Sequence, residues 1–268
     1  TIDTGSFSAK PYLMILGHII PTASNAPNYR VNSDTGSNYA QRYSDNDAAD
    51  TTDTSNTVWY YDTGAATANP KFTVSTMNNI SAQEKLGIDH TMDSNASGAG
   101  NAPTRREGVS KWTNTSSQIT SVQAVANTST FASGSEVVVL GYDPADTSGT
   151  NAWEELASND ESSGTNTVTF TAKKYLWVQF KVENSGSIQP ELILGSGGSI
   201  DTGNNFSTRV NSADIGSSDA TRTSQDSIET ERASTAPIFM NFFIINKSDK
   251  EKLCIVEAIS QESAGAGN

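Results

Sequence analysis

The chain repeats itself over most of its length. The phrase Phe7–Leu13 returns as Phe170–Leu176, 163 residues later. Three further phrases return 167 residues later and in the same order: Asp34–Tyr39 as Asp201–Phe206, Glu84–Leu86 as Glu251–Leu253, and Gly98–Asn101 as Gly265–Asn268. Four ordered matches with one four-residue slip predict a tandem duplication, in which one folding unit occurs twice.

The second copy is shorter than the first. In the first copy, Asn101 is followed by two strand-like runs, Ile119–Val125 and Ser135–Tyr142, whereas the second copy stops at Asn268, so 41 residues have no counterpart. A sandwich without these strands would have open sheet edges, which natural proteins rarely leave uncovered. Either the sequence is cut short, or a neighbouring subunit supplies the strands by donor-strand addition. We hypothesise that an intermolecular strand completes this half.

Short runs of β-branched and aromatic residues, separated by polar turns, predict an all-β fold. We expect strands at Tyr12–Ile20, Thr57–Tyr61, Lys71–Met77, Ile119–Val125, Glu136–Tyr142, Thr167–Thr171, Tyr175–Val182, Glu191–Leu194 and Ile238–Ile245. Only Ala152–Ala157 has a helical pattern, as a single turn. The predicted architecture is a tandem duplicated antiparallel β-sandwich of jelly-roll type, with the second repeat incomplete at its C-terminus. Residues 1–147 form the first sandwich, 148–166 a linker whose Trp153 and Leu156 pack at the junction, and 167–268 the second sandwich.

The charge balance excludes several classes of partner. Lys and Arg number 17 against 30 Asp and Glu, which gives a formal net charge of −13. A nucleic-acid binder needs a basic face, and an anionic membrane surface attracts basic segments, so we expect neither partner. No apolar run approaches the roughly 18–20 residues of a membrane span. The single cysteine, Cys254, excludes an internal disulfide framework and a cysteine-built metal site.

The repeated Asp-Thr-Gly tripeptide is also found in aspartic proteases, but here we interpret it as a structural turn. Two-lobed aspartic proteases place one such loop in each half, and here Asp34 and Asp201 would be the paired carboxylates. The same tripeptide also begins at Asp3 and Asp62, however, so we interpret it as an Asx-turn. The two histidines, His18 and His90, are not duplicated, and we expect both to be structural. We therefore predict no enzymatic activity and no required cofactor.

One loop rich in oxygen ligands is the best candidate for an ion site. Asp45, Asp47 and Asp50, with Asp53 close by, could offer hard oxygens to Ca²⁺, which takes 6–8 of them. The second copy keeps only one of these acids, and EF-hand spacing is absent, so a solvated acidic loop is the alternative. The aromatic run Trp59–Tyr61 and Trp112 could form a platform for sugar stacking, although aromatic residues in strands usually belong to the core.

Three segments carry a resemblance to a known group of proteins: Asn32–Asp53, Gly134–Asp146 and Asn151–Ser158. They resemble repeated segments of β-sandwich structural proteins of tailed marine viruses that infect bacteria or archaea, described as tail, fibre or capsid-associated. The resemblance covers most of both repeats and rests on turn-and-strand phrases such as SGSEVVVLGYDPADTSGTNAWEELAS. It implies a virion role and assigns no functional residue.

Together these observations predict a virion structural protein, a capsid-surface, tail or fibre subunit that self-assembles. Its expected partners are further copies of the chain, joined by strand exchange, other virion proteins and a glycan on the host surface. We expect it in the virion or outside the cell. Two alternatives stay open: a cellular extracellular filament or surface-layer protein, and a secreted carbohydrate-binding module.

Overall fold

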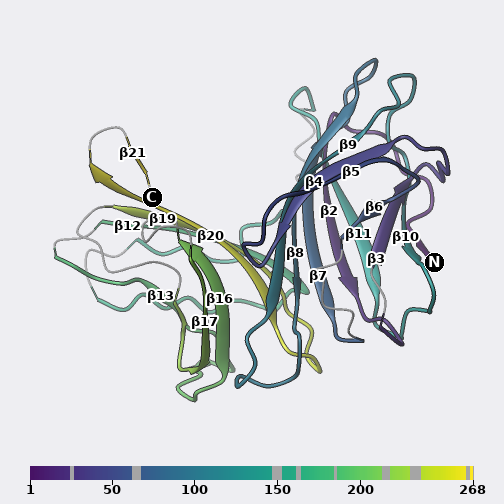
Figure 1. The fold of residues 1–268 in the computed structure, drawn as a ribbon. Coiled ribbons are helices and arrows are strands. Elements are labelled where there is room, and N and C mark those ends of the chain that lie inside the picture. Colours follow the sequence, from purple (N-terminus) through teal and green to yellow (C-terminus); the bar gives the residue numbers. More distant parts are fainter. Residues whose placement is uncertain are drawn as a thin grey trace.

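The computed structural model describes all residues except 25–26, 62–67, 147–152, 161–163, 184–185, 213–217, 230–236, 264–265 and 268. All regular structure in the described residues is β-strand, arranged in antiparallel sheets (Figure 1). This confirms the predicted all-β sandwich-type fold, whereas the jelly-roll type and the tandem duplication stay predictions. The described residues contain no helix that could cross a membrane.

The first half is a two-layer sandwich. Its larger sheet has the strand order β11-β2-β7-β8-β9-β4-β5, and its smaller sheet has the order β1-β10-β3-β6. The core between the sheets contains Ile15, Tyr29, Trp59, Trp112 and Val122, all at most 1% exposed. The strands are β1 (Ile2–Asp3), β2 (Tyr12–Ile19), β3 (Pro27–Val31), β4 (Tyr39–Asp45), β5 (Thr51–Asn56), β6 (Trp59–Tyr60), β7 (Lys71–Asn78), β8 (Lys85–Asp93), β9 (Thr104–Trp112), β10 (Val122–Ala126) and β11 (Glu136–Tyr142).

The second half is more open. One sheet has the order β12-β19-β20-β21, and three strand pairs, β13-β18, β14-β15 and β16-β17, accompany it. Its core contains Ile238, Met240, Phe242 and Ile244, but many side chains around this core are only partly buried. The strands are β12 (Tyr175–Val182), β13 (Glu191–Leu192), β14 (Gly195–Ser196), β15 (Ser199–Ile200), β16 (Phe206–Ser212), β17 (Ser218–Gln225), β18 (Ile228–Glu229), β19 (Ile238–Ile245), β20 (Leu253–Ser263) and β21 (Ala266–Gly267).

Strand pairing in the two halves has the same register at the offsets of the sequence repeat. Tyr12 faces Asn78 in the β2–β7 pair, and Tyr175 faces Ile245 in the β12–β19 pair. Lys71 faces Asp93 in the β7–β8 pair, and the corresponding residues of β19 and β20, Ile238 and Ser260, face each other. A duplicated sequence would produce this correspondence, so β2, β7, β8 and β4 serve below as counterparts of β12, β19, β20 and β16.

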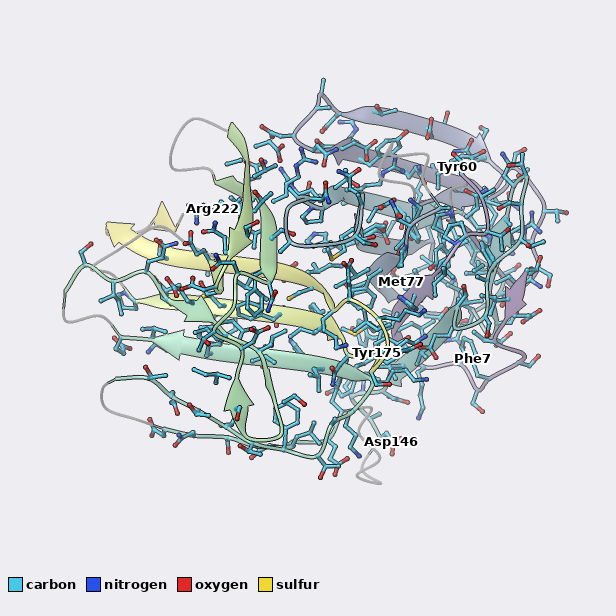
Figure 2. All side chains as sticks on the ribbon, turned by 90° about the horizontal axis from the view of Figure 1, so that it is seen from below. Phe7, Tyr60, Met77, Asp146, Tyr175 and Arg222 are labelled. Carbon is cyan, nitrogen blue, oxygen red and sulfur yellow. The ribbon has the colours of Figure 1, made fainter. Side chains whose placement is uncertain are left out.

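The halves meet at a shared apolar cluster. Leu16, Phe72 and Val74, on the outer face of the large sheet, pack against Leu253 and Ile255 on the outer face of the second sheet. Trp153 packs on the same cluster, as expected for the junction, and Tyr175 lies where the two halves meet (Figure 2). Figure 1 shows the second sheet running away from this junction at an angle to the first half.

Two local predictions are wrong. Residues 153–157 have no helical turn, and Thr167–Thr171 forms no strand but lies exposed without regular structure. An isolated single turn has one hydrogen bond to offset the ordering of several residues, so a helical pattern this short has little stability. A strand needs a neighbouring strand for its hydrogen bonds, and in the described residues none lies beside Thr167–Thr171.

Candidate functional site

In the described part of the second half, no strand takes the position that β9 has in the first half. In the first half, β9 pairs with β8 on one side and with β4 on the other. No described strand lies between their counterparts, β20 and β16. Within the described residues β16 pairs only with β17, and β20 is paired on that edge only at its far end, by β21. We call the space between β16 and β20 the strand slot.

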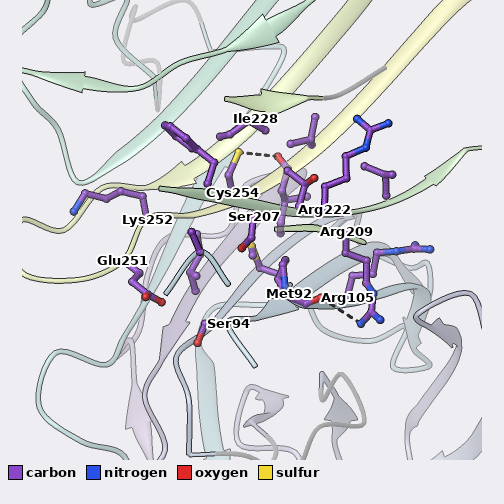
Figure 3. Close-up of a pocket in the computed structure, with 18 of the residues that line it drawn as sticks. Met92, Ser94, Arg105, Ser207, Arg209, Arg222, Ile228, Glu251, Lys252 and Cys254 are labelled. Carbon is purple, nitrogen blue, oxygen red and sulfur yellow. Dashed lines mark hydrogen bonds between the residues drawn. The ribbon is translucent and has the colours of Figure 1, made fainter. Parts of the chain in front are cut away.

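A cavity of about 910 Å³ occupies the strand slot (Figure 3). Consecutive residues of both strands line it, 206–211 of β16 and 253–256 of β20 among them. Successive side chains of a strand point to opposite faces. The face that includes Ile228 of β18 carries Phe206, Thr208 and Val210 from β16, and Cys254, Val256 and Ala258 from β20. The counterparts in the first half are Tyr39, Gln41, Tyr43, Gly87, Asp89 and Thr91. On this face the slot is therefore more apolar than the corresponding face of the first half.

The first half forms one wall of the cavity. Met92 and Arg105 reach it from β8 and β9 (Figure 3). The loop between these strands is held by the second half: the Gly98 N–H donates to Glu251 Oε1 at 2.6 Å, and the Ser224 N–H donates to the Ala99 carbonyl at 2.7 Å. These bonds tie the loop to both sides of the slot.

The arginines at the slot are already paired. Arg209 Nε lies 3.0 Å from one oxygen of Asp219, and Arg105 Nη2 lies 3.3 Å from the other. Arg222 pairs with Glu229. The chain as a whole has a net charge of −13. In the strand slot, by contrast, the positive and negative side chains offset each other.

Two polar side chains on the slot wall, Cys254 and Thr208, differ in how well they suit a buried interior. Burial raises the pKa of the Cys254 thiol, so this cysteine stays protonated and behaves as a small apolar side chain. The Thr208 hydroxyl is buried and makes no hydrogen bond within the described structure. Its counterpart in the first half, Gln41, accepts a hydrogen bond from the Tyr60 N–H at 2.9 Å. An unsatisfied buried hydroxyl is costly, so the slot carries a polar group that still requires a partner.

The first half exposes a second candidate surface. Leu86, Ile88 and Val109 are 56%, 59% and 53% exposed, and Ile88 lies directly opposite Val109 in the β8–β9 pair. The counterparts of Leu86 and Ile88 in the second half are Leu253 and Ile255, which are buried against the first half. We call Leu86, Ile88 and Val109 the β8 patch. The first half thus leaves open a surface that its counterpart uses to contact a neighbouring unit.

Both repeated aspartates close turns. The Gly36 N–H and Asn38 Nδ2 donate to Asp34 at 2.8 and 2.9 Å, and Trp112 Nε1 donates to it at 2.7 Å. Burial opposes ionisation of Asp34, but these donors outweigh it and hold its pKa below the usual value. Asp201 makes the same bonds within its own turn, without a tryptophan donor in the described residues. Both carboxylates are therefore engaged as turn acceptors, the role given by the Asx-turn interpretation.

The proposed calcium ligands do not converge. Both oxygens of Asp45 accept hydrogen bonds from Arg106, at 2.7 and 2.9 Å, and Asp47 accepts one from Asn211 Nδ2 at 2.9 Å. Asp50 is exposed just before β5. The described residues hold no group of three His, Cys, Asp or Glu that could bind a metal ion. A calcium site in this loop stays a prediction, and it would have to compete with Arg106 for Asp45.

The histidines lie at the junction of the halves. His18 is buried, with Nδ1 3.3 Å from the Gly134 carbonyl and 3.1 Å from Lys247 Nζ. Burial and the adjacent ammonium lower its pKa to about 4, so it is neutral at pH 7. His90 Nδ1 lies 3.3 Å from Glu257 Oε1, a contact between the halves. Within the described residues, these partners of the two rings are a carbonyl, an ammonium and a carboxylate, none of which is a hydroxyl or thiol nucleophile.

The aromatic residues considered for sugar stacking are in the core, because Trp59, Tyr61 and Trp112 are at most 2% exposed. A different aromatic cluster reaches the surface beside the junction. Here a cavity of about 460 Å³ is lined by Tyr12, Tyr142, Trp153 and Trp177, together with the 3.0 Å ion pair between Lys10 and Asp146. We call it the aromatic cavity.

No protein-family model matches this sequence, and neither the curated proteins nor the solved structures contain a match. The sequence predicts open sheet edges in the second half but does not reveal the space between β16 and β20 or the β8 patch. The available signal was the repeat itself, since aligning Tyr39–Asp45 and Lys85–Asp93 with their later copies identifies β16 and β20.

Proposed function

We propose that this chain is a self-assembling structural subunit, a virion structural protein at a capsid surface, tail or fibre. The observation that carries the proposal is the β8 patch. Contiguous exposed apolar surface of this kind marks interaction sites, and here the corresponding residues of the second half are already buried in a contact between units.

The virion location rests on the sequence resemblance, and the structure is compatible with it. An assembly unit needs complementary surfaces and no chemistry, and the conspicuous carboxylates and histidines are engaged in turns, ion pairs and the junction. An extracellular filament or surface-layer protein would use the same surfaces.

Light scattering of the purified chain tests the proposal. We expect a particle several times the 28.4 kDa chain mass. Ile88→Asp should reduce the particle to smaller species, since a charge buried in an apolar contact is costly. Ile188→Asp, at a side chain 44% exposed outside the patch, is the matched control and should leave the mass unchanged. A parent chain that stays monomeric at high concentration would refute self-assembly, and collapse with a chelator would promote the Asp45 loop to a calcium site.

The aromatic cavity favours a second candidate function, binding of a host-surface glycan. Exposed rings beside a charged pair are a common arrangement for stacking on a sugar while hydrogen-bonding its hydroxyls. Tyr12, Tyr142 and Trp177 are 44%, 59% and 39% exposed. A glycan array followed by titration of tryptophan fluorescence tests it: Trp177→Ala should abolish any binding found, and Asp146→Asn should weaken it. An array without hits would remove this candidate.

A further inference from the structure

Lys71 and Asp93 form an ion pair in the interior of the first half. They face each other in the β7–β8 pair, Lys71 Nζ contacts Asp93 Oδ2, and both side chains are 0% exposed. We propose that these two side chains condense to an amide, which joins β7 to β8 covalently. The inference goes beyond self-assembly and does not depend on it, because it assigns to the first half a site of spontaneous covalent modification.

The surroundings place the pair in a closed interior. Because successive side chains of a strand point to opposite faces, Lys71, Thr73 and Met77 share one face of β7. Met77 belongs to the core between the two sheets. In the next pair on this face, Thr73 and Thr91 are both buried and their hydroxyl oxygens are 3.0 Å apart. An ammonium and a carboxylate lose their hydration in such a place, and their mutual attraction often does not repay that loss. An amide removes both charges and keeps one donor and one acceptor.

Backbone hydrogen bonds hold the two reacting groups in place. The Asn95 N–H donates to Asp93 Oδ1 at 2.6 Å, and the Ser94 N–H donates to the Pro70 carbonyl at 3.2 Å. The first bond fixes the carboxylate with its other oxygen toward the lysine, and the second joins the residues adjacent to the pair on both strands. Reactants held together in this way have effective molarities of up to about 10⁵–10⁸ M, which offsets the tendency of water to oppose amide formation.

The condensation balances within the pair. The Lys71 ammonium gives one proton to Asp93 Oδ2, which leaves a neutral amine and a neutral carboxyl group. The amine nitrogen attacks Cγ with its lone pair, and the negative charge that develops on Oδ1 meets the Asn95 N–H, a donor already in position. The nitrogen then passes a second proton to Oδ2, the Cγ–Oδ2 bond breaks, and Oδ2 leaves as water. The step needs no oxidant and no other reactant.

Two other places in the chain provide internal comparisons. The corresponding residues of the second half, Ile238 and Ser260, cannot form an amide, so this site should release a single water molecule per chain. Lys111 and Glu84 form a contrasting pair, with Nζ and Oε2 3.1 Å apart but both side chains exposed. Hydrated charges gain little from neutralisation, and we expect this pair to stay ionic.

Intact-mass spectrometry tests the proposal on chains that are incubated folded and then denatured. We expect the parent mass to be lower than the sequence mass by one water molecule, whereas Lys71→Arg should have its full sequence mass. Lys111→Arg is the matched control and should lose one water molecule as the parent does. After trypsin digestion of the parent, residues 43–85 should stay uncut at Lys71 and be joined to residues 86–105, which contain Asp93.

The possible results separate the amide from other events. A parent chain that keeps its full sequence mass would overturn the proposal, and so would a loss of water that persists in Lys71→Arg. Asp93 could instead lose water by closing on its own backbone as a succinimide; trypsin would then cut after Lys71, which would also overturn the proposal. The joined peptide is read from the parent chain, so the test is decisive even if Lys71→Arg does not fold. Chains that have not yet condensed still hold the ion pair, and the free energy of that ion pair refers to them.

Discussion

Replacing Lys71 by isoleucine leaves a carboxylate buried without its counter-ion. Lys71 and Asp93 form an ion pair across β7 and β8, and both side chains are 0% exposed. Removing one partner of a buried pair typically costs about 3–5 kcal/mol, because the remaining charge is uncompensated. The second half has an uncharged pair at the corresponding position, where Ile238 faces Ser260. We therefore expect Lys71→Ile to destabilise the first half by about 3–5 kcal/mol, and adding Asp93→Ser to recover most of that loss.

Urea denaturation followed by tryptophan fluorescence measures this, since Trp59 and Trp112 are buried in the first half. The four proteins of the double-mutant cycle give the coupling free energy directly. Asp93→Ser keeps a hydroxyl that can accept the hydrogen bond now donated by the Asn95 N–H at 2.6 Å. If the double variant is as unstable as Lys71→Ile, the loss comes from packing and not from the stranded charge, and the reasoning is wrong.

Three further predictions concern polar groups of the first half. The pKa of His18 is lowered from 6.5 to about 4, so the unfolded chain takes up its proton first as the pH falls. Stability should drop by up to about 3 kcal/mol between pH 6.5 and 4, and His18→Leu should remove that share of the slope in urea midpoints. Burial raises the pKa of Asp89, so its ionisation opposes folding above pH 3.8; the stability of Asp89→Asn relative to the parent should therefore rise from pH 4 to pH 7. Trp112→Phe removes the donor to Asp34 and should cost about 1–3 kcal/mol in the same assay.

The apolar strands could be predicted from the sequence because their pattern matches their burial. Tyr175–Val182 and Ile238–Ile245 have the bounds predicted for them, and Glu136–Tyr142 does as well. β8 escaped prediction because its pattern is inverted. Its buried positions carry Lys85, Asp89 and Asp93, while Leu86 faces solvent. A reading of the hydrophobic periodicity therefore places the face that is buried in the structure on the outside.

The strand predicted at Thr167–Thr171 is absent for the opposite reason. Its alternation and composition predict a strand, and the local signal is sound, but strand formation depends on a partner that the described residues do not provide. The sequence predicts open sheet edges in the second half, but the positions of the candidate sites were beyond sequence reasoning on the same ground. The β8 patch is defined by what its counterpart contacts, and the strand slot by a strand that is absent between two others. Neither property belongs to any single stretch of sequence.

The two interiors differ in what they require of a strand that lies beside β8 or β20. In the first half, β9 is bound through specific polar contacts: Arg106 to Asp45, and Trp112 to Asp34. Asp89, buried next to β9, accepts a hydrogen bond from Tyr61 at 2.7 Å. A strand from elsewhere would have to reproduce such partners, since each unmatched buried polar group costs about 1–3 kcal/mol. The slot has Val256 in place of Asp89, so an incoming strand needs little more than backbone hydrogen bonds and an apolar face. The interior beside β20 thus makes fewer polar demands on a neighbouring strand than the interior beside β8 does.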